Sequence, residues 1–187
     1  MGEFMNYRML VNKDNALDKS YVPDDLVDAR SNYKEGILIN KEVLEQFNLM
    51  KIDAFKLGYK IDIMSGYRDY FYQEKIYNKL LNERGLAYTF RSVAKAGCSE
   101  HHTGLAIDIC IYRDDKCYIE HEVEYMEEIQ WLINNCYKYG FILRYPLGME
   151  DKTGYNYEPW HFRYVGNIAK YLWMNNMLLE DYVANKN

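Results

Sequence analysis

Residues 98–112 read CSEHHTGLAIDICIY, and this stretch decides how the rest of the chain is interpreted. Its second half, residues 105–112, is apolar and rich in β-branched side chains, which predicts a strand. A loop over residues 91–103 leads into that strand, and His101 and His102 stand near the end of the loop. One carboxylate, Asp108, interrupts the apolar run. The stretch therefore predicts a strand with an isolated carboxylate and two imidazoles at its entrance.

Outward from this strand, helical and extended patterns follow one another without the regular alternation that is typical of parallel sheets. Helices are predicted where apolar residues recur at helical spacing between a capping residue and a glycine. The predicted helices cover residues 40–56, 69–84 and 122–139; the predicted strands cover 59–64, 105–112, 141–145 and 160–165. Residues 6–30 are rich in turn formers and predict an irregular lead-in. The pattern predicts the α+β class, with short helices closing the chain.

Length and charge limit the class of protein. The chain has 187 residues, a formal net charge of −5 and 49% hydrophobic residues, which is typical of one globular domain over residues 1–187. The sequence contains no block rich in lysine or arginine, so we expect no nucleic-acid partner. No apolar run approaches the length that spans a membrane.

The N-terminus and the cysteines bear on the compartment. The first ten residues lack the apolar stretch of a signal peptide, and residues 1–4 resemble an addition made in cloning ahead of a second start at Met5. No CxxC pair is present, so we expect free thiols and a reducing compartment. We therefore expect a cytoplasmic protein, or one of the cell envelope if a signal or anchor was removed.

Four side chains suggest a catalytic zinc site. His101, Asp108 and His161 offer two imidazoles and a carboxylate, and a catalytic zinc ion uses three protein ligands and leaves one position for water. Glu158 precedes His161 by three residues and is suited to take a proton from that water. Spacing alone leaves open whether His101 or His102 is the ligand. It also leaves open that Asp108 is a buried carboxylate satisfied by hydrogen bonds.

Arg68 ends the turn SGYR, residues 65–68. A planar guanidinium suits a terminal carboxylate, or the oxyanion that forms on a scissile carbonyl. Ser99 and Gln73 are candidates for neutral hydrogen bonds to the same end of a substrate. The alternative is that SGYR is only a turn between a strand and a helix.

Three motifs together resemble a known family. The segments SGYRDYFYQ, CSEHHTGLAIDI and EPWHFRYVG resemble the signature of the zinc D-alanyl-D-alanine carboxypeptidases of the VanY type. The pattern SxHxxGxAxD is met by residues 99–108, and the pattern ExWH by residues 158–161. The resemblance extends from about Leu10 to Gly166. Its closest likeness is to the bifunctional D,D-dipeptidase/D,D-carboxypeptidases of vancomycin resistance.

The resemblance implies a fold and roles for the residues. It implies an α+β fold in which a small antiparallel sheet, packed by helices, carries the zinc site. It implies zinc bound by His101, Asp108 and His161, which selects His101 over His102. Glu158 is then the general base, and Arg68 faces the substrate carboxylate or the oxyanion. The sequence departs from the family at His102 and at the residue after Arg68, both expected near the rim of the cleft.

These expectations define a main hypothesis and several alternatives. The main one is a zinc-dependent D,D-carboxypeptidase that removes the terminal D-Ala from peptidoglycan precursor peptides, with cleavage of the D-Ala-D-Ala dipeptide as a second activity. An L,D-carboxypeptidase that trims tetrapeptides is the first alternative. A phage-type endopeptidase and a non-catalytic, zinc-stabilised peptidoglycan-binding module are the others. A general base beside the metal separates the enzymes from the binding module.

Overall fold

The computed structural model describes residues 6–185. Residues 1–4, which the sequence suggests were added in cloning, lie outside the described residues. No helix among the described residues is long and apolar enough to cross a membrane.

The centre of the fold is a five-stranded sheet in which every pairing is antiparallel. Four strands run in the order β3-β4-β7-β6, and β5 pairs with β4. A separate two-stranded sheet joins β1 to β2. The strands are β1 Leu26–Asp28, β2 Leu38–Asn40, β3 Lys60–Ser65, β4 Ala106–Arg113, β5 Lys116–Tyr118, β6 Phe141–Leu143 and β7 His161–Tyr164. The predicted α+β class and small antiparallel sheet are confirmed.

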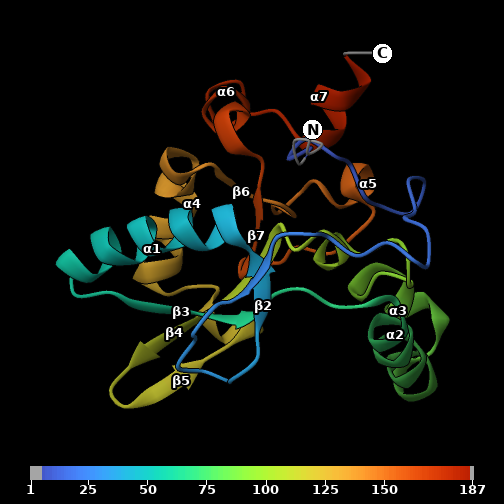
Figure 1. Ribbon diagram of the computed structural model, residues 1–187, viewed down its shortest axis with the longest axis horizontal. Helices are drawn as coiled ribbons and strands as arrows, with labels where there is room; N and C mark the ends of the chain where they lie inside the picture. The colour runs from blue at the N-terminus through green and yellow to red at the C-terminus, as the bar shows by residue number, and fades with distance from the viewer. Residues whose placement is uncertain (1–5, 186–187) are drawn as a thin grey trace.

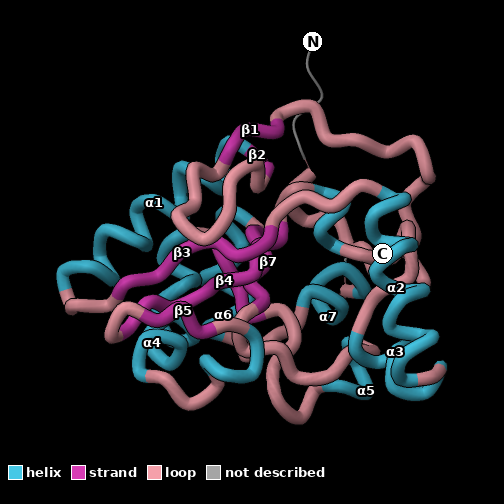
Figure 2. Tube along the Cα trace, turned by 90° about the horizontal axis from the view of Figure 1, so that it is seen from below, coloured by secondary structure: helices cyan, strands magenta, loops and turns pink. Residues whose placement is uncertain are grey.

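The helices α1 to α4 lie in two groups beside the sheet. In both views α1 and α4 lie toward one end of the molecule, and α2 and α3 lie together at the other (Figures 1 and 2). The helices are α1 Lys41–Lys56, α2 Tyr70–Arg84, α3 Leu86–Ser92, α4 Glu127–Asn135, α5 Glu150–Thr153, α6 Ala169–Met174 and α7 Leu179–Ala184. Short 3-10 helices are η1 Glu100–Thr103, η2 Glu120–Val123, η3 Cys136–Tyr139 and η4 Gly166–Ile168.

Local capping explains where α1 and α2 begin. The Asn40 side chain accepts hydrogen bonds from the backbone of the first turn of α1. Asp69 does the same for α2 by accepting from the backbone N–H of Tyr72 at 2.7 Å. Gly85 ends α2 with a φ of 78°, as predicted from the sequence.

The two faces of β4 and β7 carry different side chains: one face is apolar and the other carries polar groups. Side chains alternate between the faces of a strand, so neighbours in sequence point to opposite sides. One face packs into the hydrophobic core against α1 and α4; on these strands it consists of Ile107, Ile109, Ile111, Phe162 and Tyr164. Asp108 and His161 therefore point to the other face. A one-residue slip would exchange the two sets, so burial of the core fixes the face that carries the polar groups.

Three predicted details are wrong. The strands β1, β2 and β5, of three residues each, were not predicted. The predicted loop over residues 91–103 contains the end of α3 and all of η1. The predicted helix 122–139 begins only at Glu127, because Glu122 accepts a hydrogen bond from the backbone N–H of Ile119 and closes η2 instead.

Candidate active site

Asp108 and His161 meet because β4 and β7 pair. The antiparallel register places them directly opposite each other, where side chains of facing residues are in contact. Oδ1 of Asp108 lies 3.2 Å from Nδ1 of His161. Both side chains are buried. Strand pairing alone thus brings a carboxylate and an imidazole together below the surface.

His101 completes the cluster from η1, just before β4. Its Nε2 atom lies 3.3 Å from Oδ2 of Asp108, and its ring stands at 89° to that of His161 with centroids 5.0 Å apart. One donor atom from each of the three residues lies within 4.8 Å of the other two. The structure therefore gathers the three side chains that the sequence marked as a metal set.

The two adjacent histidines have different environments. Nδ1 of His101 bonds the Gly66 carbonyl oxygen at 2.6 Å, which leaves Nε2 for the cluster. His102 uses both ring nitrogens on the backbone: Nε2 accepts from the N–H of Gly97 at 3.0 Å, and Nδ1 bonds the Arg68 carbonyl at 2.6 Å. His102 is buried rather than at the rim of a cleft, which corrects that expectation. His102 joins the backbone at Gly97 to the backbone at Arg68 through hydrogen bonds. Only His101 contacts the cluster.

Gly66 allows its carbonyl to approach His101 because it has no side chain. A Cβ atom there would lie 2.4 Å from the Leu38 carbonyl oxygen and 2.5 Å from Cγ2 of Ile39. We expect Gly66→Ala to lower the free energy of unfolding by about 1–3 kcal/mol, the usual cost of overpacking. Urea denaturation followed by circular dichroism measures this. An unchanged midpoint would show that the strands β2 and β3 separate at no cost.

The cluster has the properties of a divalent metal site. Nε2 of His101 and Oδ1 of Asp108 are buried and, within residues 6–185, have no hydrogen-bond partner. Two imidazoles and a carboxylate form a donor set that zinc prefers. Burial would lower the pKa of His161, but contacts with Asp108 and Glu100 raise it to about 9. The neighbouring carboxylates therefore favour a positive charge on the His161 ring.

Glu158 lies beside the cluster. Its Oε2 atom is 3.5 Å from Nδ1 of His161, and its side chain is 15% exposed. Burial raises the pKa of the Glu158 carboxyl to about 7, although His161 and Arg68 oppose the shift. A carboxyl with a pKa in this range can both take and return a proton near neutral pH.

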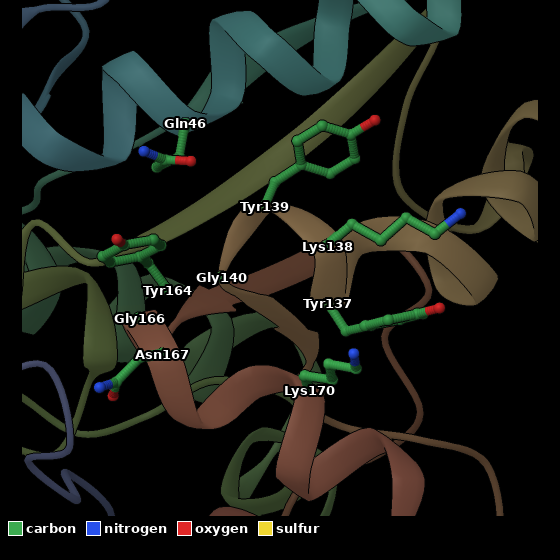
Figure 3. Close-up of a pocket in the computed structure, with 9 residues that line it drawn as sticks. All are labelled: Gln46, Tyr137, Lys138, Tyr139, Gly140, Tyr164, Gly166, Asn167 and Lys170. Atoms are coloured by element: carbon green, nitrogen blue, oxygen red, sulfur yellow. The ribbon is translucent and has the colours of Figure 1, made fainter.

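A cavity of about 400 Å³ opens at Glu158. It is bounded by α2, α3 and η2, and its lining includes Ile76, Lys79, Tyr88, His121, Glu158 and Trp160. A second, more open hollow of about 570 Å³ lies between α1, η3 and α6, and Gln46, Tyr139 and Tyr164 are among its lining residues (Figure 3). Neither hollow is lined by His101, Asp108 or His161, but Glu158, which lies beside them, lines the first. The cavity at Glu158 is therefore the better candidate for a substrate site.

The other candidate residues, Arg68, Ser99 and Gln73, differ in what they contact. Arg68 approaches it, with Nη2 3.7 Å from Oδ2 of Asp108 and a side chain that is 18% exposed. Ser99 is buried, and its hydroxyl accepts from the backbone N–H of His101 at 3.3 Å. Gln73 is buried on α2 and donates to the Ala94 carbonyl at 2.7 Å. Arg68 is thus the one of the three that contacts the cluster with its side chain.

Sequence reasoning missed a buried ionic network behind the cluster. Oε1 of Glu100 lies 2.7 Å from Nε of Arg144 and 3.0 Å from Nη1 of Arg163. Arg144 also binds both carboxylate oxygens of Glu180 on α7. Two arginines inside the otherwise apolar strands FILRY and WHFRYV were the available signal, because arginine is seldom buried without a partner.

Comparison with known proteins agrees with this geometry. Residues 36–167 match the family model described as VanY: D-alanyl-D-alanine carboxypeptidase. The chain is 38% identical over 164 residues to VanXYC of Enterococcus gallinarum, a bifunctional D-Ala-D-Ala dipeptidase and D-Ala-D-Ala carboxypeptidase. That match covers 87% of this chain and 85% of VanXYC.

Two solved structures share the fold. The LdcB LD-carboxypeptidase superposes with a TM-score of 0.84 at 40% identity, covering 94% of this chain and 84% of LdcB. A mutant of the vancomycin-resistance D,D-pentapeptidase VanY, solved in complex with Zn(II), superposes with a TM-score of 0.81 at 30% identity. It covers 95% of this chain and 98% of the VanY chain.

Proposed function

Because the chain belongs to the VanY family of D-alanyl-D-alanine carboxypeptidases, we propose that it is a zinc-dependent D,D-carboxypeptidase that removes the terminal D-Ala from peptidoglycan precursor peptides. The observation that carries the proposal is Glu158, which lies beside the gathered set of His101, Asp108 and His161 and lines a cavity. A binding module would need the metal set but no carboxyl poised for proton transfer. Cleavage of the free D-Ala-D-Ala dipeptide is proposed as a second activity.

Zinc would be held by His101, Asp108 and His161. When bound, it would act as a Lewis acid on the scissile carbonyl and would lower the pKa of a water molecule. The Zn(II) complex of the VanY relative supports this choice of metal. Histidine and carboxylate ligands also suit other divalent ions, so metal analysis of the purified protein is part of the test.

Glu158 acts as the proton carrier. It accepts the proton of the attacking water and delivers it to the nitrogen of the leaving D-Ala. Glu158 lines the cavity that α2, α3 and η2 bound, so we place the substrate in that cavity.

Arg68 binds the free carboxylate of the substrate or the developing oxyanion. We expect Arg68→Ala to lower kcat/KM by about 10²–10³-fold while zinc remains bound, the size of effect seen when one such donor is removed. Steady-state kinetics separate the two roles. If Arg68 binds the substrate carboxylate, its loss should mainly raise KM; if it stabilises the oxyanion, its loss should mainly lower kcat. Arg68→Lys keeps the charge and should recover part of the loss. Full activity of Arg68→Ala would exclude both roles.

The substrate panel tests the function as a whole. We would measure release of D-Ala from the pentapeptide precursor, the tetrapeptide and the free dipeptide, each with and without a chelator. Chelator-sensitive release from the pentapeptide is expected. Release from the tetrapeptide alone would favour the L,D-carboxypeptidase alternative, which the similarity to LdcB supports. No release from any of them, with zinc bound, would refute the proposed activity.

A further inference from the structure

Glu100 approaches His161 at Nε2, the ring nitrogen that does not face Asp108. Its side chain is fully buried, and its Oε2 atom lies 3.6 Å from Nε2 of His161. Among the residues that the structure describes, neither of these two buried atoms has a hydrogen-bond partner. A buried polar atom without a partner costs free energy, so a small approach of the two groups would satisfy both.

Building on the proposed function, we propose that Glu100 is a positioning residue for the metal centre: it accepts the Nε2–H of His161 and thereby directs the lone pair of Nδ1 at the cluster. A neutral imidazole carries one proton, so an acceptor at Nε2 leaves Nδ1 free as a ligand. Nδ1 is the nitrogen that lies 3.2 Å from Asp108 and 3.5 Å from Glu158.

The arginines keep Glu100 an acceptor. Its other oxygen, Oε1, contacts Nε of Arg144 and Nη1 of Arg163, at 2.7 and 3.0 Å. The remaining nitrogens of Arg144 bind Glu180 at 2.9 and 2.5 Å. Two guanidinium groups and two carboxylates thus balance, which is the condition under which buried charges are tolerated. Glu100 therefore stays ionised and has no proton to offer to His161.

His101 is oriented in the same way from its opposite nitrogen. Its Nδ1 bonds the Gly66 carbonyl, and Nε2 faces Asp108. One ligand histidine is thus fixed by a backbone oxygen and the other by a carboxylate. Loss of such an outer partner typically weakens metal affinity by about 10–100-fold.

The test is the zinc dissociation constant of Glu100→Gln, measured by competition with a chromophoric chelator. The two arginines will hold the amide oxygen of the new side chain, so its NH₂ group faces Nε2 of His161. Because that NH₂ group donates, it favours the tautomer with the proton on Nδ1, which cannot bind. We expect zinc to bind about 10–100-fold more weakly than to the wild type. The visible absorption of the cobalt-substituted protein should change as well.

Glu128→Gln is the matched control. Glu128 is also buried, and it binds Arg113 through both carboxylate oxygens, outside the residues that contact the cluster. The same chemical change there weakens an ion pair between a buried carboxylate and a partly exposed arginine. A merely structural role for Glu100 predicts equal effects of both variants on zinc binding. We expect Glu128→Gln to keep the zinc dissociation constant and the cobalt spectrum of the wild type.

Each outcome decides the matter. Wild-type zinc affinity in Glu100→Gln, or equal weakening in Glu128→Gln, would overturn the role of Glu100 and leave the proposed function intact. A wild-type protein that binds no zinc would refute the proposed function itself. If Glu100→Gln does not fold, Glu100→Asp keeps the charge at the arginines and withdraws it from His161. Weaker zinc binding by that variant supports the role, and unchanged binding overturns it.

Discussion

We expect replacement of Glu158 by Gln to lower kcat by about 10²–10⁴-fold while bound zinc is retained. That range is what a positioned general acid or base contributes to catalysis. The amide has the size of the carboxyl but cannot take the proton of the attacking water. Because Glu158 lies 3.5 Å from His161 rather than within the three-residue metal set, the metal should stay bound. Steady-state release of D-Ala and metal analysis of the same sample measure the two quantities.

A carboxylate elsewhere in the same cavity provides the control for Glu158. Glu83 lines the cavity from α2 and is exposed, so Glu83→Gln should leave kcat close to the wild-type value. Full turnover by Glu158→Gln with zinc bound would remove the general base from the mechanism. Loss of zinc from that variant would instead make Glu158 a ligand.

His161→Ala should abolish activity and zinc binding together. The substitution removes one of three ligands, so the loss of zinc affinity should exceed the 10–100-fold cost of losing an outer partner. Zinc stripped from the wild type by a chelator should be replaceable, with return of activity. The variant should not recover at the same zinc concentration. Competition with a chelator and D-Ala release measure both effects.

His121→Ala is the matched control for His161→Ala. His121 is exposed and contacts Trp160 edge-on, with ring centroids 4.7 Å apart. It lies outside the metal set, so its variant should keep zinc. Circular dichroism of the two variants separates metal loss from unfolding. A fully metallated and active His161→Ala protein would refute the assignment of that ligand.

Much of the fold could be predicted because its signals are local. Asn40 caps α1, and Gly85 and Gly140 end helical segments at positive φ, each for a reason that the residue type itself contains. The failures are short elements. A strand of three residues such as β5 has too few positions to show an alternation. The start of α4 depended on a competing side-chain bond at Glu122, which periodicity does not register.

The site was less accessible to sequence reasoning. The residues of the cluster could be named, but the pairing of β4 with β7 that sets Asp108 opposite His161 depends on contacts between distant segments. Spacing alone did not separate His101 from His102; the family resemblance selected His101, and the two backbone partners of His102 give the physical reason. The burial of Glu100, between Ser99 and His101, was not predicted, because an acidic residue in a loop normally points to solvent.

The ion pair between Arg144 and Glu180 bears on how much chain a working enzyme requires. The family match ends at residue 167, yet Glu180 lies beyond it on α7. A chain shortened to the family boundary would lose this partner and leave Arg144 with a surplus positive charge next to Glu100. We therefore expect proteolysis or truncation between α6 and α7 to disturb the buried ion pairs around Glu100. For the same reason we expect the smallest functional unit to extend past the matched segment to Glu180.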